Sequence, residues 1–519
     1  MNSQDIKHIV IVGGGTAGWM SAAALAHVLK PLKLRITLVE SEQLGTVGVG
    51  EATIPHLRYF NARLGINEHE FIRTTQATYK LGIEFVDWGR KGESYIHPFG
   101  DFGQKINDLD FIHYWTQNQL QGVQDSIFEY SMPVAACQKK RFTYPSSDTQ
   151  SILSKFSYAF QMDASGYAQY LRAYSEERGV QRVEGKITDV IRCKHSGDIE
   201  TLHLGNGKEI HGDFFIDCSG FRSLLLGETL SVGYDDWSKW LPCNRAIAVP
   251  STKMDVLPPY TKAKALSAGW KWSIPLQHRT GNGVVYCSNF LSDDEASEQL
   301  LQETQGDPLA DLNFLKFTTG RRRKTWSHNC LAIGLSSGFL EPLESTSIYL
   351  IQIAIMTFIE QFPQNNDSEI PRKQFNQQMA LEYERIRDFI ILHYHATHRD
   401  DSEFWNYCRT MDVPDTLKEK LESFTQLGYL DQYQHGLFLL PSWVAVLIGQ
   451  GFEPQSYHPF ANAVANDDRR AYMAQLKENI HQQAEKLRPH NDVLAEHCQA
   501  KEGEHPWPTS SLSLYDVFS

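Results

Sequence analysis

Three glycines near the N-terminus have the spacing of a turn that binds phosphate groups. Gly13, Gly15 and Gly18 follow the pattern G-x-G-x-x-G, directly after the apolar run His8–Val12. In such a turn the first glycine permits a tight bend, the second lets the backbone approach a pyrophosphate, and the third lets a helix pack closely against the strand. The free N–H groups at the start of that helix attract the phosphates.

Glu40 has the position of an acid that binds the ribose of a dinucleotide. It ends a second apolar run, Arg35–Glu40, and follows Gly18 by the roughly 20 residues typical of this acid. An acid here argues against the extra phosphate of NADP, but it does not distinguish NAD from FAD. A glycine-rich turn without a ligand is the disfavoured alternative, because strand, helix and acid all occur at the expected spacing.

The elements that must position this turn predict an α/β fold. The two apolar runs enclose a helix expected over residues 19–29, and such a Rossmann-type βαβ unit opens a mainly parallel sheet. Further buried strands are expected in Asp213–Gly220 and at residues 330–334, and a long apolar helix is expected from Ser347 onward.

The chain is long enough for more than one structural unit. Its 519 residues exceed the roughly 250–300 residues at which a single apolar core stops growing. The polar segment Pro363–Arg372 is the best linker candidate, and the chain after it is typical of helices. We therefore predict a module with mixed sheets over residues 1–370 and a mainly helical part over residues 371–519.

Composition excludes several classes of function. The net charge of −13 argues against nucleic acid as the main partner, because phosphate binding needs a basic surface. The longest apolar runs are too short for a membrane span, and no signal peptide is visible at the N-terminus. The eight cysteines include no C-x-x-C pair, so neither a zinc site nor a disulfide framework is expected, and a cytoplasmic enzyme is the natural expectation.

Four further motifs resemble those of a known enzyme family. They are Gly48–Pro55 "GVGEATIP", Ile216–Leu225 "IDCSGFRSLL", Trp270–Pro275 "WKWSIP" and Gly338–Thr346 "GFLEPLEST". Together with the N-terminal glycines they closely resemble the flavin-dependent halogenases of the tryptophan-halogenase type. The resemblance runs from residue 7 to about residue 450, and the pattern W-x-W-x-I-P is highly specific.

The resemblance implies a flavin-monooxygenase-like FAD module and a two-component reaction. A separate flavin reductase supplies FADH2, which reacts with O2 to give a flavin hydroperoxide. Chloride or bromide then attacks it to give hypohalous acid, which reaches a lysine and halogenates an electron-rich aromatic ring. The FAD contacts would match Gly13, Gly15, Thr16, Ala17, Gly18, Glu40, Ala52, Ile187, Leu335 and Ile348.

The lysine of the family corresponds to Lys80, in "TTQATYKLGIEF". The sequence pattern alone favours a surface lysine on an amphipathic helix, and only the resemblance reverses this interpretation. Burial among the neighbouring apolar residues would lower its pKa from about 10.4. Lys80 could then direct the oxidant in either form, as a neutral amine that forms a haloamine or as an ammonium that donates a hydrogen bond to hypohalous acid.

The resemblance places a second catalytic role on Glu344, and not on the nearby Glu341. A carboxylate beside the ring can stabilise the cationic intermediate and accept its proton. Glu344 also precedes the apolar helix, so an acid at a helix N-terminus, with capping by Ser345 or Thr346, is a second interpretation. The family binds halide with backbone N–H groups that match Thr346 and Ser347, where members that act on free tryptophan usually have glycine at the latter position.

Aromatic residues complete the site that the resemblance implies. Trp270 and Trp272 alternate, so on a strand they share a face, where they would separate the substrate from the flavin. His97 and Phe99 match residues that line the substrate ring. The three histidines of the H-x-H-x-x-H pattern at residues 393–398 could suggest a metal, but the family uses none there, and we expect no metal site.

The C-terminal region departs from the members that act on free tryptophan. Those members hold the amino-acid head with adjacent tyrosines and a glutamate, and Ser423–Trp443 contains neither. We therefore expect a substrate such as indole, and bromide accepted at least as well as chloride. The alternatives are a single-component flavin hydroxylase and a flavoprotein scaffold without catalysis. The sequence leaves the natural substrate, a carrier and the oligomeric state open, a homodimer included.

Overall fold

The glycine turn follows β1 (His8–Val12), one of the two central strands of a six-stranded sheet. The computed structural model describes residues 5–41, 50–365, 368–431 and 436–499. Neighbouring strands of this sheet pair in parallel, except the antiparallel edge pair β21–β22. In sheet order the strands are β21 (Trp326–Ser327), β22 (Cys330–Ala332), β13 (Phe214–Asp217), β1 (His8–Val12), β2 (Arg35–Glu40) and β9 (Gln181–Glu184). The predicted βαβ unit, with helix α1 (Thr16–Val28) between β1 and β2, is confirmed.

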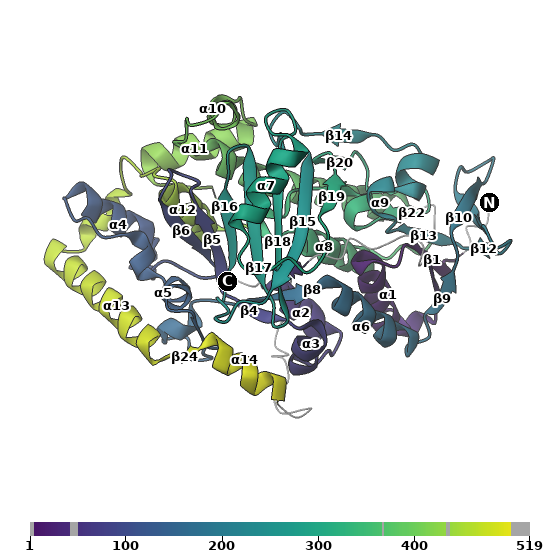
Figure 1. Cartoon of the computed structure of the whole chain (residues 1–519), viewed down its shortest axis with the longest axis horizontal. Helices are drawn as coiled ribbons and strands as arrows, with labels where there is room; N and C mark the ends of the chain where they lie inside the picture. Colours follow the sequence, from purple (N-terminus) through teal and green to yellow (C-terminus); the bar gives the residue numbers. More distant parts are fainter. Residues whose placement is uncertain (1–4, 42–49, 366–367, 432–435, 500–519) are drawn as a thin grey trace.

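A seven-stranded sheet occupies the middle of the molecule (Figure 1). It is antiparallel apart from the parallel pair β16–β5, and its strand β17 carries the W-x-W-x-I-P motif. In sheet order the strands are β19 (Asn313–Lys316), β15 (Arg245–Thr252), β18 (Arg279–Tyr286), β17 (Gly269–Pro275), β16 (Thr261–Ala265), β5 (Gly82–Val86) and β6 (Ser94–Pro98).

A small sheet packs against the seven-stranded sheet and positions Lys80. Its central strand β8 (Ala159–Asp163) pairs in antiparallel fashion with β3 (Gly50–Ala52) and β4 (Thr78–Lys80). Helices α2 (His56–Arg63), α3 (Glu68–Thr75) and α6 (Ala164–Glu176) pack beside it. The remaining strands are β7 (Arg141–Phe142), β10 (Ile187–Arg192), β11 (Ile199–Leu204), β12 (Glu209–His211), β14 (Tyr234–Asp236), β20 (Gly320–Arg322), β23 (Gly338–Phe339) and β24 (Arg488–Pro489).

The chain after the sheets is mainly helical, as predicted. Helices α8 (Ser347–Glu360) and α9 (Glu369–His395) are followed by α10 (Glu403–Thr410), α11 (Asp415–Leu427), α12 (Leu440–Gly449), α13 (Asn466–Lys486) and α14 (His490–Gln499). Helices α10 to α13 lie at the end of the molecule away from β1 (Figure 1), together with α4 (Phe111–Leu120). Two more helices are α5 (Met132–Gln138) and α7 (Asp293–Glu303). The proposed division at residue 370 stays a prediction.

Helix α8 is apolar on all sides because it lies in the core. Twelve of its residues, Ile348 to Ile359, are buried, and the helix packs against α1, α2 and α9. No helix in the described ranges is both long enough and apolar enough to span a membrane.

Candidate active site

A cavity of about 750 Å³ opens at the carboxyl ends of β1 and β2. Ligands of α/β sheets bind at such strand ends. Nine of the ten residues predicted to contact FAD line this cavity: Gly13, Gly15, Thr16, Ala17, Glu40, Ala52, Ile187, Leu335 and Ile348. Glu51 and Arg172 also line it, and the sequence analysis did not single them out.

The tenth residue, Gly18, packs the helix onto the turn instead. A Cβ atom at Gly18 would lie 1.8 Å from the carbonyl oxygen of Gly13, and a Cβ atom at Gly13, where φ is +109°, would lie 2.2 Å from the carbonyl oxygen of Cys218. At Gly15 a Cβ atom would have no atom of the described part of the chain within 4 Å. The turn therefore offers open space beside Gly15 and the N-terminus of α1, which is the fit that a pyrophosphate requires.

Glu40 lines the cavity with its carboxylate held by two arginines. Its Oε1 accepts a hydrogen bond from Arg182 Nε, and Arg172 Nη1 lies 3.8 Å from the same oxygen. Arg182 lies on β9, which pairs with β2, and Arg172 lies on α6, so the carboxylate is held at the rim where a ribose would lie.

Replacing Gly15 by valine is expected to weaken FAD binding by at least about 100-fold while the fold stays intact. The new side chain would project into the space for the pyrophosphate, and no atom of the described residues lies within 4 Å of its Cβ position. Titration of the apoprotein with FAD, followed by flavin fluorescence, measures the change. Gly205→Val, at an exposed glycine in ordinary van der Waals contact, is the matched control. An unchanged affinity in Gly15→Val would remove FAD from this turn.

Trp270 and Trp272 form part of the wall of the large cavity. Both line the cavity from strand β17, and their ring centroids are 6.0 Å apart. The indole N–H of Trp270 donates a hydrogen bond of 2.9 Å to Glu341 Oε2, which also accepts one of 2.5 Å from the Tyr394 hydroxyl. The expected shared face of the two tryptophans is therefore confirmed, and Glu341 fixes the first of them.

Lys80 is completely buried at the end of strand β4, and not on an amphipathic helix. Its Nζ donates hydrogen bonds of 3.0 Å to the carbonyl oxygen of Thr53 and 2.8 Å to Ser345 Oγ, and it lies 5.1 Å from the centroid of the Phe99 ring. Ser345 lines the large cavity, whereas Phe99 lines a second, smaller one. Lys80 thus bridges the wall between two cavities.

Burial lowers the pKa of Lys80 to about 7, and the nearby Glu344 carboxylate opposes this shift. In the unfolded chain the pKa of a lysine is about 10.4. Between pH 7 and pH 10 the unfolded state therefore binds the extra proton, and the contribution of Lys80 makes the folded state more stable as the pH rises.

This linkage predicts a pH-dependent stability difference between the wild type and Lys80→Met. The free energy of unfolding of the wild type should gain on that of the variant between pH 7 and pH 10, by about 1.4 kcal/mol per pH unit at most. Denaturant titrations of both chains across this range measure the difference. A difference that stays constant with pH would mean that Lys80 keeps an ordinary pKa in the folded protein.

Glu344 lies between two buried imidazoles. His97 Nδ1 is 3.0 and 2.9 Å from Glu344 Oε1 and Oε2, and His393 Nε2 is 2.7 Å from Oε1. His393 Nδ1 is also 2.8 Å from the Phe389 carbonyl oxygen. Both ring nitrogens of His393 therefore face oxygen atoms that can only accept hydrogen bonds.

The two glutamates of this turn have opposite electrostatic surroundings. Burial alone would raise the pKa of Glu344, but His97 and His393 lower it to about 2. Burial raises the pKa of Glu341 to about 7, although Tyr394 and Trp270 donate to it. Environments that separate two carboxyl pKa values in this way are typical of sites with divided acid and base roles. Glu344 is thus a permanent carboxylate at neutral pH.

Helix α9 supplies partners that the sequence analysis did not identify. Its neighbouring residues His393 and Tyr394 contact Glu344 and Glu341, respectively, which lie three positions apart around the 3-10 turn Pro342–Glu344. The H-x-H-x-x-H pattern at residues 393–398 was the sequence feature that could have drawn attention to the end of this helix. However, His395 faces the Cys408 carbonyl oxygen, 3.2 Å away, and no metal-binding group is found in the described part of the chain.

The expected capping of α8 by Ser345 or Thr346 is wrong. Thr346 occupies the N-cap position but makes no side-chain capping bond, because its φ and ψ of −90° and −9° are helical and not extended. Ser345, at φ +60°, accepts the Lys80 hydrogen bond instead. Among the described residues, the buried Thr346 hydroxyl has no hydrogen-bond partner. With the N–H groups of the first helical turn, this end of α8 fits a small anion.

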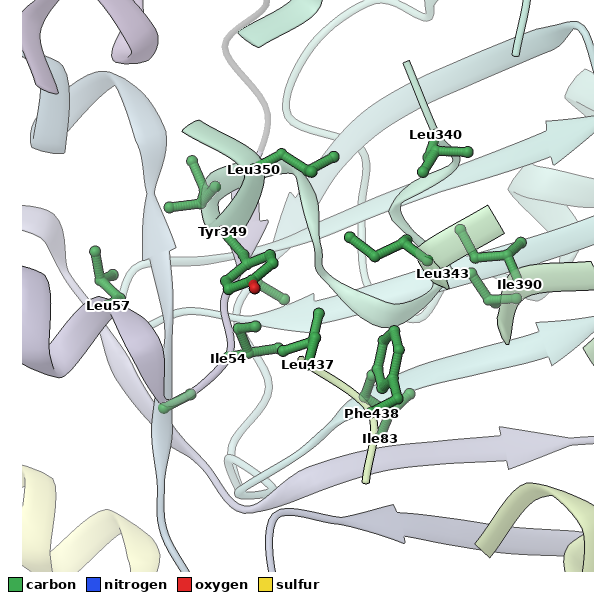
Figure 2. Packing of buried hydrophobic residues seen from close by; sticks show 14 of the residues in the cluster. Ile54, Leu57, Ile83, Leu340, Leu343, Tyr349, Leu350, Ile390, Leu437 and Phe438 are labelled. Atoms are coloured by element: carbon green, nitrogen blue, oxygen red, sulfur yellow. The ribbon is translucent and has the colours of Figure 1, made fainter. Parts of the chain in front are cut away.

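The second cavity is small and lies next to Glu344. It has a volume of about 30 Å³, and His97, Phe99 and Glu344 line it. Leu437 and Phe438 close it, and Phe438 stacks on Phe389 with ring centroids 3.8 Å apart. Figure 2 shows Ile54, Leu437 and Phe438 in this packing, with Leu343 on the turn that leads to Glu344. An aromatic ring can enter here only when this apolar packing opens.

The segment Ser423–Trp443, which lacks the tyrosine pair and the glutamate, includes the residues that close the small cavity. Residues 432–435 of Ser423–Trp443 lie outside the described residues, as do Gly48 and Val49 of the "GVGEATIP" motif. The described part places Leu437, Leu439 and Ser442 on the cavity wall. These side chains bring no charge that could pair with an amino-acid head.

Comparison with known proteins gives a consistent result. Residues 8–466 match the protein family described as tryptophan halogenase. The chain is 36% identical over 482 residues to the tryptophan 6-halogenase SttH of Streptomyces toxytricini, which covers 87% of this chain and 90% of that protein. The structure is similar to BrvH, a flavin-dependent halogenase from Brevundimonas sp. BAL3, with a TM-score of 0.92 and 44% identity over 95% of this chain and 99% of that one. It is also similar to Xcc4156, a flavin-dependent halogenase from Xanthomonas campestris, with a TM-score of 0.92 and 43% identity over 96% and 99% of the two chains.

Proposed function

Since this chain belongs to the tryptophan halogenase family and is a flavin-dependent halogenating enzyme, we propose that it halogenates small electron-rich aromatic rings such as indole, with the flavin in one cavity and the ring in another. Membership of this family favours the halogenase over the single-component hydroxylase and the inactive scaffold. The observation that carries the proposal is Lys80, which is bonded to Ser345 of the large cavity and faces Phe99 of the small one.

The large cavity would hold FAD, with the pyrophosphate beside Gly15, the ribose at Glu40, and further contacts from Ala52, Ile187, Leu335 and Ile348. When bound and reduced, FAD would supply, with O2, the oxidising equivalent that turns halide into hypohalous acid. A separate flavin reductase would deliver FADH2 by diffusion, in the cytoplasm where reduced nicotinamide is available. The backbone N–H groups of Thr346 and Ser347 would hold the halide at the start of α8.

Lys80 would take the oxidant at the wall and orient it toward the ring. In this buried position the dielectric constant is low, so a hydrogen bond from the ammonium form would polarise the oxidant more strongly than it would in water. The neutral amine would instead carry the halogen. Trp270 and Trp272 would keep the ring away from the flavin. Glu344, held by His97 and His393, would stabilise the cationic ring and accept its proton, while His97 and Phe99 would pack on the ring.

The decisive experiment is turnover of a panel of aromatics with an added flavin reductase, FAD, NADH, and either chloride or bromide. Mass spectrometry of the products should show halide-dependent halogenation. Oxygenated products without halogen would support a hydroxylase, and no product in any combination would support a scaffold.

Direct competition tests the substrate and the halide. We expect indole to turn over about 10- to 100-fold faster than free tryptophan, because a charged head without matched partners is costly to bury. We also expect at least as much brominated as chlorinated product, because bromide is less strongly hydrated and easier to oxidise. Equimolar mixtures of each pair, with products counted by mass, give both ratios. Faster turnover of tryptophan or predominantly chlorinated product would overturn the corresponding half.

A further inference from the structure

The seven-stranded sheet carries another cavity on the face opposite Trp270 and Trp272. Side chains alternate along β17, so Lys271 and Ser273 line this further cavity, which has a volume of about 630 Å³. The loop of residues 252–260 and the end of α7 form its other walls. We call this cavity the lysine groove. It shares a sheet with the candidate active site but none of its lining residues.

Positive charge dominates the lysine groove. It is lined by five lysines, Lys140, Lys253, Lys262, Lys264 and Lys271, and by three acids, Asp87, Asp255 and Glu303. Two of the lysines are neutralised: Lys264 pairs with Glu303 at 2.7 Å, and Lys262 pairs with Glu84 at 3.1 Å. Asp87 accepts a 2.7 Å hydrogen bond from the backbone N–H of Gly92.

Lys271 has no such neutralising partner. Its side chain lies directly opposite Lys264 in the β16–β17 register, and like charges in this position destabilise a sheet. Lys271 is 7% exposed, and its Nζ lies 3.4 Å from Asn282 Oδ1, a long contact. Within the described ranges, no carboxylate lies within 4 Å of it. A buried ammonium paired so weakly is costly unless an anion from outside approaches it.

The titration of Lys271 agrees with this geometry. The pKa of Lys271 is lowered to about 8, mainly by burial; Glu303 opposes this shift, and Lys262 and Lys264 act in the same direction as burial. A bound anion would restore the ordinary lysine pKa, so binding and proton uptake would be coupled.

We propose that the lysine groove binds a small organic phosphate, with the phosphate against Lys271. A dianion neutralises more of the excess positive charge than a carboxylate does. The walls also include Met254, Val256, Pro258, Tyr260 and Pro275, which suit an apolar or aromatic body attached to the phosphate. The volume is in the usual range of small-molecule sites.

Calorimetric titration with phenyl phosphate tests this proposal. The protein is first saturated with FAD, so that the glycine turn cannot take up the probe. We expect one phenyl phosphate per chain, at least about tenfold weaker binding in Lys271→Met, and weaker binding of benzoate than of phenyl phosphate. Lys418→Met, at an exposed lysine on α11, is the matched control and should bind like the wild type.

Each of the other outcomes overturns the proposal. They are no saturable binding, equal affinity in Lys271→Met, an equal loss in Lys418→Met, and tighter binding of benzoate. The melting temperature of Lys271→Met without ligand checks its folding, and it should not fall, because the substitution removes the repulsion with Lys264. Phenyl phosphate should raise the melting temperature of the wild type and leave that of Lys271→Met unchanged.

Discussion

Lys80→Ala is expected to lose halogenated product by at least about 1000-fold while it still consumes reduced flavin and O2 at the wild-type rate. Lys80 Nζ is held 3.0 Å from the Thr53 carbonyl oxygen and 2.8 Å from Ser345 Oγ, between the two cavities. The substitution removes the group that directs the oxidant from the flavin cavity to the ring. It leaves the lining of the flavin cavity unchanged, so flavin oxidation should continue.

Product by mass and flavin reoxidation by absorbance are measured on the same samples. Lys420→Ala is the matched control, because Lys420 is also buried with a lowered pKa but lies on α11. Substantial product from Lys80→Ala would contradict the role of Lys80. Slower flavin reoxidation would mean that Lys80 acts in the flavin reaction and not in the transfer of the oxidant to the ring.

Glu344→Gln should slow halogenation by about 10²–10⁴-fold. The amide keeps the size of the side chain, but it can neither hold the charge nor accept the proton of the ring. The partners His97 and His393 would then lose their shared carboxylate. Because these imidazoles hold the pKa of Glu344 at about 2, the wild-type rate should show no titration of this group between pH 5 and pH 9.

Steady-state rates with saturating reductase measure this loss. Glu382→Gln is the control: Glu382 is equally buried and accepts a 2.9 Å hydrogen bond from Tyr349, but it lines neither cavity. A decrease of only a few-fold in Glu344→Gln would reduce Glu344 to a structural acid near the start of α8.

Local patterns were enough to predict the nucleotide end of this molecule. The glycine turn, its flanking strands and Glu40 lie within one βαβ unit, so spacing along the chain determines their spacing in space. The alternation of Trp270 and Trp272 likewise predicted their shared face, because the period of a strand is two residues.

Long-range packing was beyond the reach of these patterns. Lys80 is buried because β4 pairs with β8, about 80 residues later, and Ser345 reaches it from a turn still further along the chain. The contacts of His393 with Glu344 and of Tyr394 with Glu341 depend on how α9 packs, which no short motif encodes. The capping prediction was wrong for a similar reason: Lys80 binds the Ser345 hydroxyl, and the helical φ and ψ of Thr346 remove the other cap.

A single turnover with one equivalent of prereduced FAD tests most directly whether the oxidised halogen reaches the ring through Lys80. Bromide, indole and a β-diketone that hypohalous acid halogenates in solution are present together, and each bromine atom is located by mass spectrometry. We expect bromine on indole in the wild type, and on the diketone in Lys80→Ala, with similar total bromine in both. The same amount of bromoindole from both chains would contradict the account.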